Sequence, residues 1–177
     1  MIQLMPCYSV FYGVFVAVYL RSVKANPAGI CKGLSIEHWS QPVAVTLTMK
    51  KALLGEIFHV GSEGDYSQNL KHALNLVNHR LFGPRWRTKG KRLEVLPALE
   101  QDAAGRAHYH LAVNLAGHIS REDFNALIRE VWPKTRWGYK QTHVGPANSR
   151  WVTYLIKLRS KKDPAAPFDL DNLHYWR

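Results

Sequence analysis

The sequence predicts an α+β fold in which helices pack on one face of an antiparallel β-sheet. Three observations predict it: segments with helical spacing of apolar residues, short β-branched segments, and glycine, proline and polar residues between them. With 177 residues, 46% of them hydrophobic, the chain is long enough for one compact domain with its own core. We expect a main domain over residues 37–177, after an apolar extension and linker over residues 1–36.

A strand and then a helix are predicted for the first part of the domain. Residues 43–49 (VAVTLTM) are rich in β-branched side chains, which is typical of a strand. After a glycine-rich polar loop, apolar side chains recur at steps of three and four. They predict a helix that Ser67 caps and that Gly83 and Pro84 end. The apolar side chains of this helix are Leu70, Ala73, Leu74, Val77 and Leu81.

The second part of the domain predicts a hairpin, a helix, a strand and a final helix. Residues 93–101 and 107–115 are strand-like and are separated by a short turn, so a β-hairpin is expected. Ser120, three residues before Asp123, resembles a capping box ahead of an apolar helical stripe. Residues 135–144 predict another strand, and residues 148–158 a last helix that begins with its own polar cap.

The order of these elements narrows the fold class. A βαββαβ order predicts a ferredoxin-like antiparallel sheet with helices on one face, as in RNA-recognition modules, here with an extra C-terminal helix. The opposite face of such a sheet is open for a ligand. Beyond Lys162 the chain is polar and contains prolines, so we expect it to wrap the surface.

The first twenty residues carry no charged side chain and include the apolar run VFYGVFVAVYL. The uncharged stretch of twenty residues only just reaches the length of a membrane-spanning helix, and the basic start of a secretory signal is missing. A buried strand and an extension upstream of the natural start are the alternatives. Any membrane association would come through residues 1–20. Cys7 and Cys31 fit neither a disulfide scaffold nor a zinc site, so we expect a reducing, cytoplasmic compartment.

The charge balance favours a polyanionic partner. Lysine and arginine number 24 against 13 acidic residues, for a formal net charge of +11. Binding to phosphates releases the counterions condensed on a nucleic acid, which favours association with a basic protein. An anionic membrane surface attracts the same charge, so the sign alone does not choose between these partners.

His108 and His110 are candidate metal ligands. Residues two apart on a strand share a face, so both imidazoles project to the same side. If the hairpin turn centres on Ala104, Glu100 lies opposite His108 and on that face as well. A carboxylate and two imidazoles with open positions suit a catalytic divalent ion, Mg²⁺ or Mn²⁺. Two ordinary surface histidines are the alternative interpretation.

Tyr154 and Lys157 are candidates for nucleophilic chemistry. They are three apart on the predicted last helix and therefore reach the same side. A phenol has a pKa of about 10 and is a poor nucleophile unless a cation favours the phenolate. Lys157 would supply that positive charge, and a metal-bound phosphate would offer a polarised phosphorus. In the alternative interpretation Tyr154 is a core aromatic.

Three ordered motifs resemble those of the HUH endonucleases, which include rolling-circle replication initiators, relaxases and single-strand transposases. The first motif is the apolar strand Val45-Thr46-Leu47-Thr48, and the second is His108-Tyr109-His110. The third is Tyr154-Leu155-Ile156-Lys157 on a helix. The likeness extends over about residues 40–160. Each motif is weak alone, whereas the ordered set of three is fairly specific.

The resemblance implies a mechanism. A metal on the two histidines, with Glu100, would bind the scissile phosphate of single-stranded DNA or an origin hairpin. Tyr154 would attack and leave a 5′-phosphotyrosine and a free 3′-hydroxyl, which permits later rejoining. Only one tyrosine fits the motif. The chain has no room for a helicase domain, so a separate helicase is expected. Relaxases often carry a third histidine, and spacing does not choose among His59, His118 and His143.

Basic residues interleaved with aromatics predict a DNA-binding surface, because cations contact the backbone beside stacking platforms for bases. A solvated charged face and a core tryptophan are the alternatives for each residue singly. A non-catalytic nucleic-acid-binding protein, either a degenerate initiator or a module like those that recognise RNA, is the rival function. The candidate DNA-binding residues are Arg85, Trp86, Arg87, Lys89, Lys91, Arg92, Arg136, Lys140 and Arg150.

Overall fold

A computed structural model describes residues 35–53, 59–155, 168–169 and 171–175. The apolar run of residues 1–20 and the candidate cation Lys157 lie outside these ranges, so the expectations for them stay predictions. Within the described ranges, no helix has both the length and the apolar character needed to cross a membrane.

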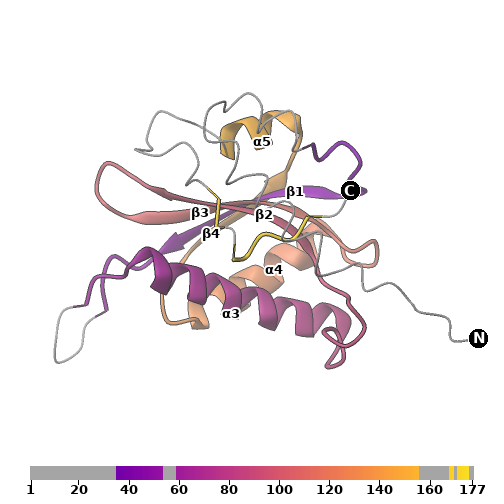
Figure 1. Ribbon diagram of the computed structural model, residues 1–177, viewed down its shortest axis with the longest axis horizontal. Coiled ribbons are helices and arrows are strands. Elements are labelled where there is room, and N and C mark those ends of the chain that lie inside the picture. The colour runs from indigo at the N-terminus through magenta and orange to yellow at the C-terminus, as the bar shows by residue number, and fades with distance from the viewer. Residues whose placement is uncertain (1–34, 54–58, 156–167, 170, 176–177) are drawn as a thin grey trace, which may run out of the picture.

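The protein has an α+β fold built on a four-stranded antiparallel sheet, as expected (Figure 1). In spatial order the strands are β2-β3-β1-β4, an arrangement compatible with a ferredoxin-like fold. Along the chain, the elements are β1 (Pro42–Met49), α3 (Glu63–Phe82), β2 (Glu94–Gln101), β3 (Ala107–Asn114), α4 (Arg121–Val131), the 3₁₀ turn η1 (Trp132–Lys134), β4 (Gly138–Pro146) and α5 (Ser149–Leu155).

Both faces of the sheet carry a hydrophobic core. Helices α3 and α4 cover one face, and α5 lies on the other (Figure 1). The main core, beneath α3 and α4, includes Leu70, Phe124 and Trp132. A second, smaller core joins Val152 and Leu155 of α5 to strands β2 and β3. The face opposite α3 and α4 is therefore open only in part, and the second core fixes α5 above the strands.

The C-terminal segment closes the outer edge of β2. Phe168 and His174 form isolated bridges with Ala98 and Val95, and the backbone N–H of Asp169 donates to the carbonyl of Pro97 at 3.0 Å. Pro97 is tolerated in β2 because its nitrogen, which cannot donate, belongs to the strand edge rather than the interior of the sheet. We expected the end of the chain to wrap the surface, but Phe168, Leu173 and Tyr175 are instead buried in the second core.

Tyr109, between the two histidines, ties this segment to the opposite face of the sheet. Its side chain is fully buried, and its hydroxyl donates to a carboxylate oxygen of Asp169 at 2.8 Å. Ser67 and Asn172 donate to the same carboxylate group. Burial and the charge of Asp169 raise the pKa of Tyr109 well above its ordinary value, so the phenol stays protonated as a donor.

The predicted cap of the long helix was wrong. Helix α3 begins at Glu63, and its N-cap is Ser62 rather than Ser67. The Ser62 side chain accepts from the backbone N–H of Asp65, whose carboxylate accepts from the N–H of Ser62. This reciprocal pair satisfies two backbone donors at once and fixes the helix start one turn earlier. The cap predicted at Ser120 is confirmed, since its hydroxyl accepts from the N–H of Asp123 at 3.0 Å.

Strand β4 begins later than expected because a tight turn precedes it. Pro133 opens η1, and the hydroxyl of Thr135 donates to the carbonyl of Trp132 at 2.7 Å. Gly138 then passes so close that a Cβ built on it would collide with the carbonyl oxygen of Trp132. Residues 135–137 therefore belong to the turn, and β4 starts at Gly138.

We predict that Gly138→Ala destabilises the protein. The added methyl group would overlap backbone atoms that cannot move independently, and overpacking of this kind costs about 1–3 kcal/mol or more. Gly117→Ala is the matched control, because nothing lies within 4 Å of its added Cβ. Urea unfolding of both variants provides the measurement. Equal midpoints for the two variants would contradict the close approach.

We also predict that stability falls as the pH drops below neutrality, through His174. Burial, with Arg92 and Lys71 nearby, lowers the pKa of His174 from 6.5 to about 4. The unfolded chain therefore binds a proton between these values and the folded protein does not, so stability is lost as the pH falls from 6.5 towards 4. His174→Gln should flatten this dependence in urea unfolding, whereas His72→Gln, on an exposed part of α3, should leave it unchanged.

Candidate active site on the sheet face

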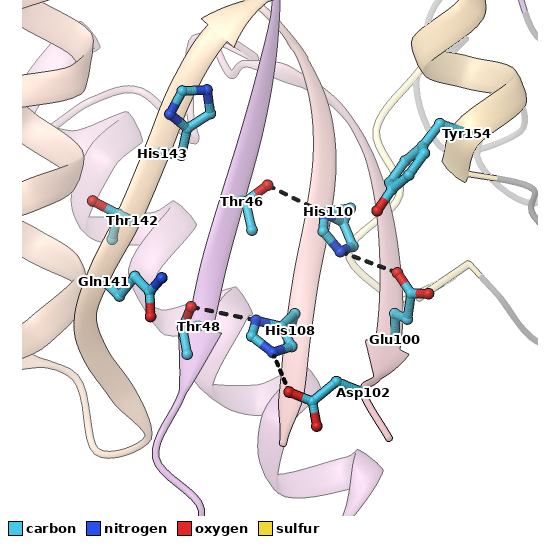
Figure 2. Close-up of a pocket in the computed structure, with 10 residues that line it drawn as sticks. All are labelled: Thr46, Thr48, Glu100, Asp102, His108, His110, Gln141, Thr142, His143 and Tyr154. Carbon is cyan, nitrogen blue, oxygen red and sulfur yellow. Dashed lines mark hydrogen bonds and ion pairs between the residues drawn. The ribbon is translucent and has the colours of Figure 1, made fainter. Parts of the chain in front are cut away.

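A cavity of about 580 Å³ opens on the face of the sheet that carries α5. Every strand and α5 contribute to its walls, so residues distant in sequence meet there (Figure 2). The cavity joins all the described residues of the predicted catalytic set. Its lining residues are Thr46, Thr48, Glu100, Asp102, His108, His110, Gln141, Thr142, His143 and Tyr154.

The pairing of β1 with β3 places threonines beside the two histidines. Thr46 is opposite His110 and Thr48 is opposite His108. The threonine hydroxyls share hydrogen bonds with the imidazole Nδ1 atoms, at 3.1 Å for His110 and 3.3 Å for His108. A hydroxyl both donates and accepts, so each threonine can hold its ring in either neutral tautomer. The Nε2 atoms are left facing the other strand, β2.

The predicted register of the hairpin is confirmed, but the Glu100 side chain contacts His110 rather than its direct cross-strand partner. Glu100 is the cross-strand partner of His108. Its carboxylate nevertheless lies 3.1 Å from Nε2 of the diagonal neighbour, His110, while Nε2 of His108 lies 3.2 Å from Asp102 (Figure 2). Diagonal neighbours on adjacent strands are within reach of long side chains. Each imidazole therefore faces its own carboxylate.

Asp102 is a residue of the site that the sequence interpretation had assigned only to the hairpin turn. Its carboxylate accepts from the backbone N–H of Arg106 at 2.8 Å and also contacts His108. The hydrogen bond from Arg106 and then the one with His108 lower the pKa of Asp102, so it stays ionised. The sequence feature that could have identified Asp102 is its position, one residue beyond the strand that carries Glu100.

Helix α5 holds Tyr154 above the histidine pair. The phenol ring meets the His110 ring edge-on, with centroids 5.3 Å apart and planes at 83°. Its hydroxyl points towards His110 and Glu100 (Figure 2). Burial, and secondarily the charge of Glu100, raise the pKa of Tyr154, so the phenol is neutral near pH 7. The side chain of Asn148 accepts from the N–H of Arg150 at 3.0 Å, which confirms the predicted polar cap at the start of this helix.

The donor set of the cavity is suited to a divalent ion in its chemistry but is arranged in pairs. Among the residues that the structure describes, no three His, Cys, Asp or Glu side chains form one group that could hold a metal ion. Within each pair, nitrogen and oxygen are 3.1–3.2 Å apart. At this separation each imidazole contacts its carboxylate directly, so an ion would have to replace that contact in order to bind. The metal stays a prediction.

The basic connector lies away from the cavity. Residues 85–92 precede Glu94 at the start of β2, whereas Glu100 is six residues further along, or about 20 Å at ~3.4 Å per residue. Trp86 is only 7% exposed, with the guanidinium groups of Arg87 and Arg92 over its ring. It therefore does not offer the exposed stacking surface that was expected. Connector cations would contact DNA only where it continues beyond the cavity.

Other cations lie on or beside elements that line the cavity. Arg136, Lys140 and Arg150 have exposed side chains on or beside β4 and α5. Lys50 donates to the carbonyl of Arg136, and Arg106 lies over the ring of Tyr139 next to Lys140. Lys50 follows strand β1 and Arg106 precedes strand β3, so only the fold brings them beside Arg136 and Tyr139.

Of the three further histidines considered from sequence, one lines the cavity. His143 is opposite Thr46 on β4 and is exposed. His59 lies against Trp137, and His118 against Phe82 and the carbonyl of Leu81. Neither of these two lines the cavity.

Comparisons of the chain with protein-family models, with curated proteins and with solved structures return no match.

We predict that Glu100→Gln lowers the pKa of Tyr154 towards its ordinary value, because the change removes a negative charge that opposes the phenolate. Ultraviolet titration of tyrosinate measures this, with Tyr154→Phe subtracted in each background. Glu122→Gln, exposed at the start of α4, is the control and should cause no change. An unaltered Tyr154 titration in Glu100→Gln would show that the carboxylate does not act on the phenol.

Proposed function

We propose that the protein is a nickase and ligase of single-stranded DNA, of the HUH rolling-circle initiator type, in which Tyr154 attacks the scissile phosphate. One observation carries the proposal: Tyr154 of α5, His108 and His110 of β3, and Glu100 of β2 line one cavity on one face of the sheet. Thr46 and Thr48 of the first motif line the same cavity, so residues of all three motifs converge, as that chemistry requires. In this proposal the fold is the ferredoxin-like βαββαβ arrangement with α5 added on the open face.

The reaction we propose needs no energy cofactor. The Tyr154 oxygen forms a bond with phosphorus while the bond from phosphorus to the 3′-oxygen breaks, and the phenol proton passes to that oxygen. One phosphodiester bond is exchanged for a phosphotyrosine bond, so the reverse reaction rejoins the strand. Bound at His108, His110 and Glu100, Mg²⁺ or Mn²⁺ would neutralise charge on the phosphate and polarise it.

The protein's own residues contribute orientation and charge. Thr46 and Thr48 fix the two imidazoles through Nδ1, which leaves each Nε2 beside a carboxylate that lines the cavity. Lys157, one turn beyond Tyr154, would favour the phenolate if the helix continues to it. The exposed cations Arg136, Lys140 and Arg150 would contact the DNA backbone outside the cavity.

This function implies partners and a location. We propose that a separate helicase unwinds the duplex, so the substrate would be single-stranded DNA or the exposed strand of an origin hairpin. Such DNA is found inside the cell, and we propose a cytoplasmic location. A non-catalytic nucleic-acid-binding protein would use the same basic surface without cutting.

The test of this proposal is covalent capture of DNA. Labelled single-stranded DNA, both of random sequence and from the source replicon, is incubated with the protein in Mn²⁺ or in EDTA and resolved on a denaturing gel. We expect a metal-dependent adduct that Tyr154→Phe abolishes while binding stays nearly intact. Tyr139→Phe, a partly buried tyrosine outside the cavity, is the matched control and should form the adduct normally.

The histidine pair is tested in the same assay. Replacing both His108 and His110 by Ala should abolish the adduct at every Mn²⁺ and Mg²⁺ concentration, because both imidazole ligands are lost. A fully active double variant would remove the metal assignment. Retained cleavage in Tyr154→Phe would remove the nucleophile. DNA binding without any adduct, on DNA that includes the natural origin, would favour the non-catalytic function.

A further inference from the structure

The ring of Trp151 stacks on that of Tyr154. The two residues are three apart on α5 and therefore lie on the same side of the helix. Their ring centroids are 4.9 Å apart, and the planes are inclined by only 10°. One face of the phenol is thus covered by a larger aromatic ring, which restricts rotation of the Tyr154 side chain.

The indole is itself fixed to the strand that carries the histidines. Its Nε1 atom donates to the backbone carbonyl of Leu111 at 2.9 Å. Leu111 follows His110 directly, and β3 is an interior strand paired on both sides. The hydrogen bond therefore joins α5 to a rigid part of the sheet, one residue from a candidate metal ligand.

The His110 ring completes a cluster of three. Its centroid lies 6.0 Å from that of Trp151 at 74°, and 5.3 Å from that of Tyr154 at 83°. Edge-to-face and stacked contacts of this kind each add about 0.5–1.5 kcal/mol beyond burial. Trp151 therefore contacts both the candidate nucleophile and the imidazole beneath it.

We propose that Trp151 is a positioning residue, which holds the Tyr154 phenol in line with a phosphate bound over His110. This rests on the proposed nicking function. Attack requires a reacting oxygen at about 3–3.5 Å with its orbitals aligned, and a misplacement of about 1 Å costs on the order of 100-fold in rate. Trp151 acts through Tyr154, and no contact of its own with DNA is invoked.

Two variants separate the stacking from the hydrogen bond. Trp151→Leu removes both and should slow single-turnover adduct formation by about 100-fold. Trp151→Phe keeps a stacked ring without the N–H donor, and should lose about ten-fold or less. The Kd for the same oligonucleotide should stay within about two-fold in both, because the uniform binding of DNA is untouched. Thr153→Ala, on the exposed side of α5, is the control and should react at the wild-type rate.

A second readout needs no DNA. In protein labelled with 3-fluorotyrosine, the ¹⁹F resonance of Tyr154 is assigned by its absence from Tyr154→Phe. The ring current of the stacked indole displaces this resonance, so Trp151→Leu should move it towards the position of free fluorotyrosine. Thr153→Ala should leave it in place. Thermal unfolding of each variant distinguishes loss of orientation from loss of the fold.

The outcomes distinguish this inference from the function on which it rests. Wild-type adduct formation together with full-speed nicking by Trp151→Leu would overturn the role of Trp151 alone. A loss confined to the Kd, with the rate at saturation intact, would also overturn it, because Trp151 would then be a DNA contact. No adduct from the wild-type protein, on DNA that includes the natural origin, would refute nicking itself, whatever the ¹⁹F resonance does.

Discussion

The register between β1 and β3 is the constraint on which the candidate site depends. Thr46 opposite His110 and Thr48 opposite His108 form two cross-strand pairs that share one face of the sheet. Because side chains alternate along a strand, a slip of one residue would turn both imidazoles into the core beneath α3 and α4. Tyr109 opposes such a slip, since its buried ring and its hydrogen bond to Asp169 belong on the other face.

The charges within the cavity determine which charge a bound ligand must carry to favour the Tyr154 phenolate. Each imidazole is matched by a carboxylate, and the charge of Glu100 adds to burial in raising the pKa of Tyr154. In this state the phenol is held neutral and is a weak nucleophile. A cation bound at His108, His110 and Glu100, as we propose, would offset the carboxylate charge near the phenol, which is a physical reason to expect metal dependence. Placing the phenol beside a carboxylate would then restrain reaction until the ion and DNA are present.

Local patterns in the sequence predicted the α+β class, the hairpin register that sets Glu100 opposite His108, and the shared face of the two histidines, because these follow from short-range periodicity. The start of α3 was missed because two serines compete for the cap, and only Asp65 completes the box for Ser62. Burial of Trp86 beneath two guanidinium groups was expected only as the alternative to an exposed stacking surface, since a basic context does not distinguish between them. The contribution of Trp151 depends on contacts between distant segments, which no local pattern contains.

The central claim is that the sheet face and α5 together make Tyr154 the nucleophile, and mass spectrometry of the captured adduct tests it most directly. Trypsin cleaves after Arg150 and Lys157, which releases residues 151–157 with Tyr154 as their only tyrosine. After nuclease treatment of the adduct, our account predicts a nucleotide mass on this peptide, with fragment ions that place it on Tyr154. A nucleotide on any other residue, from protein that nicks DNA, would contradict the account.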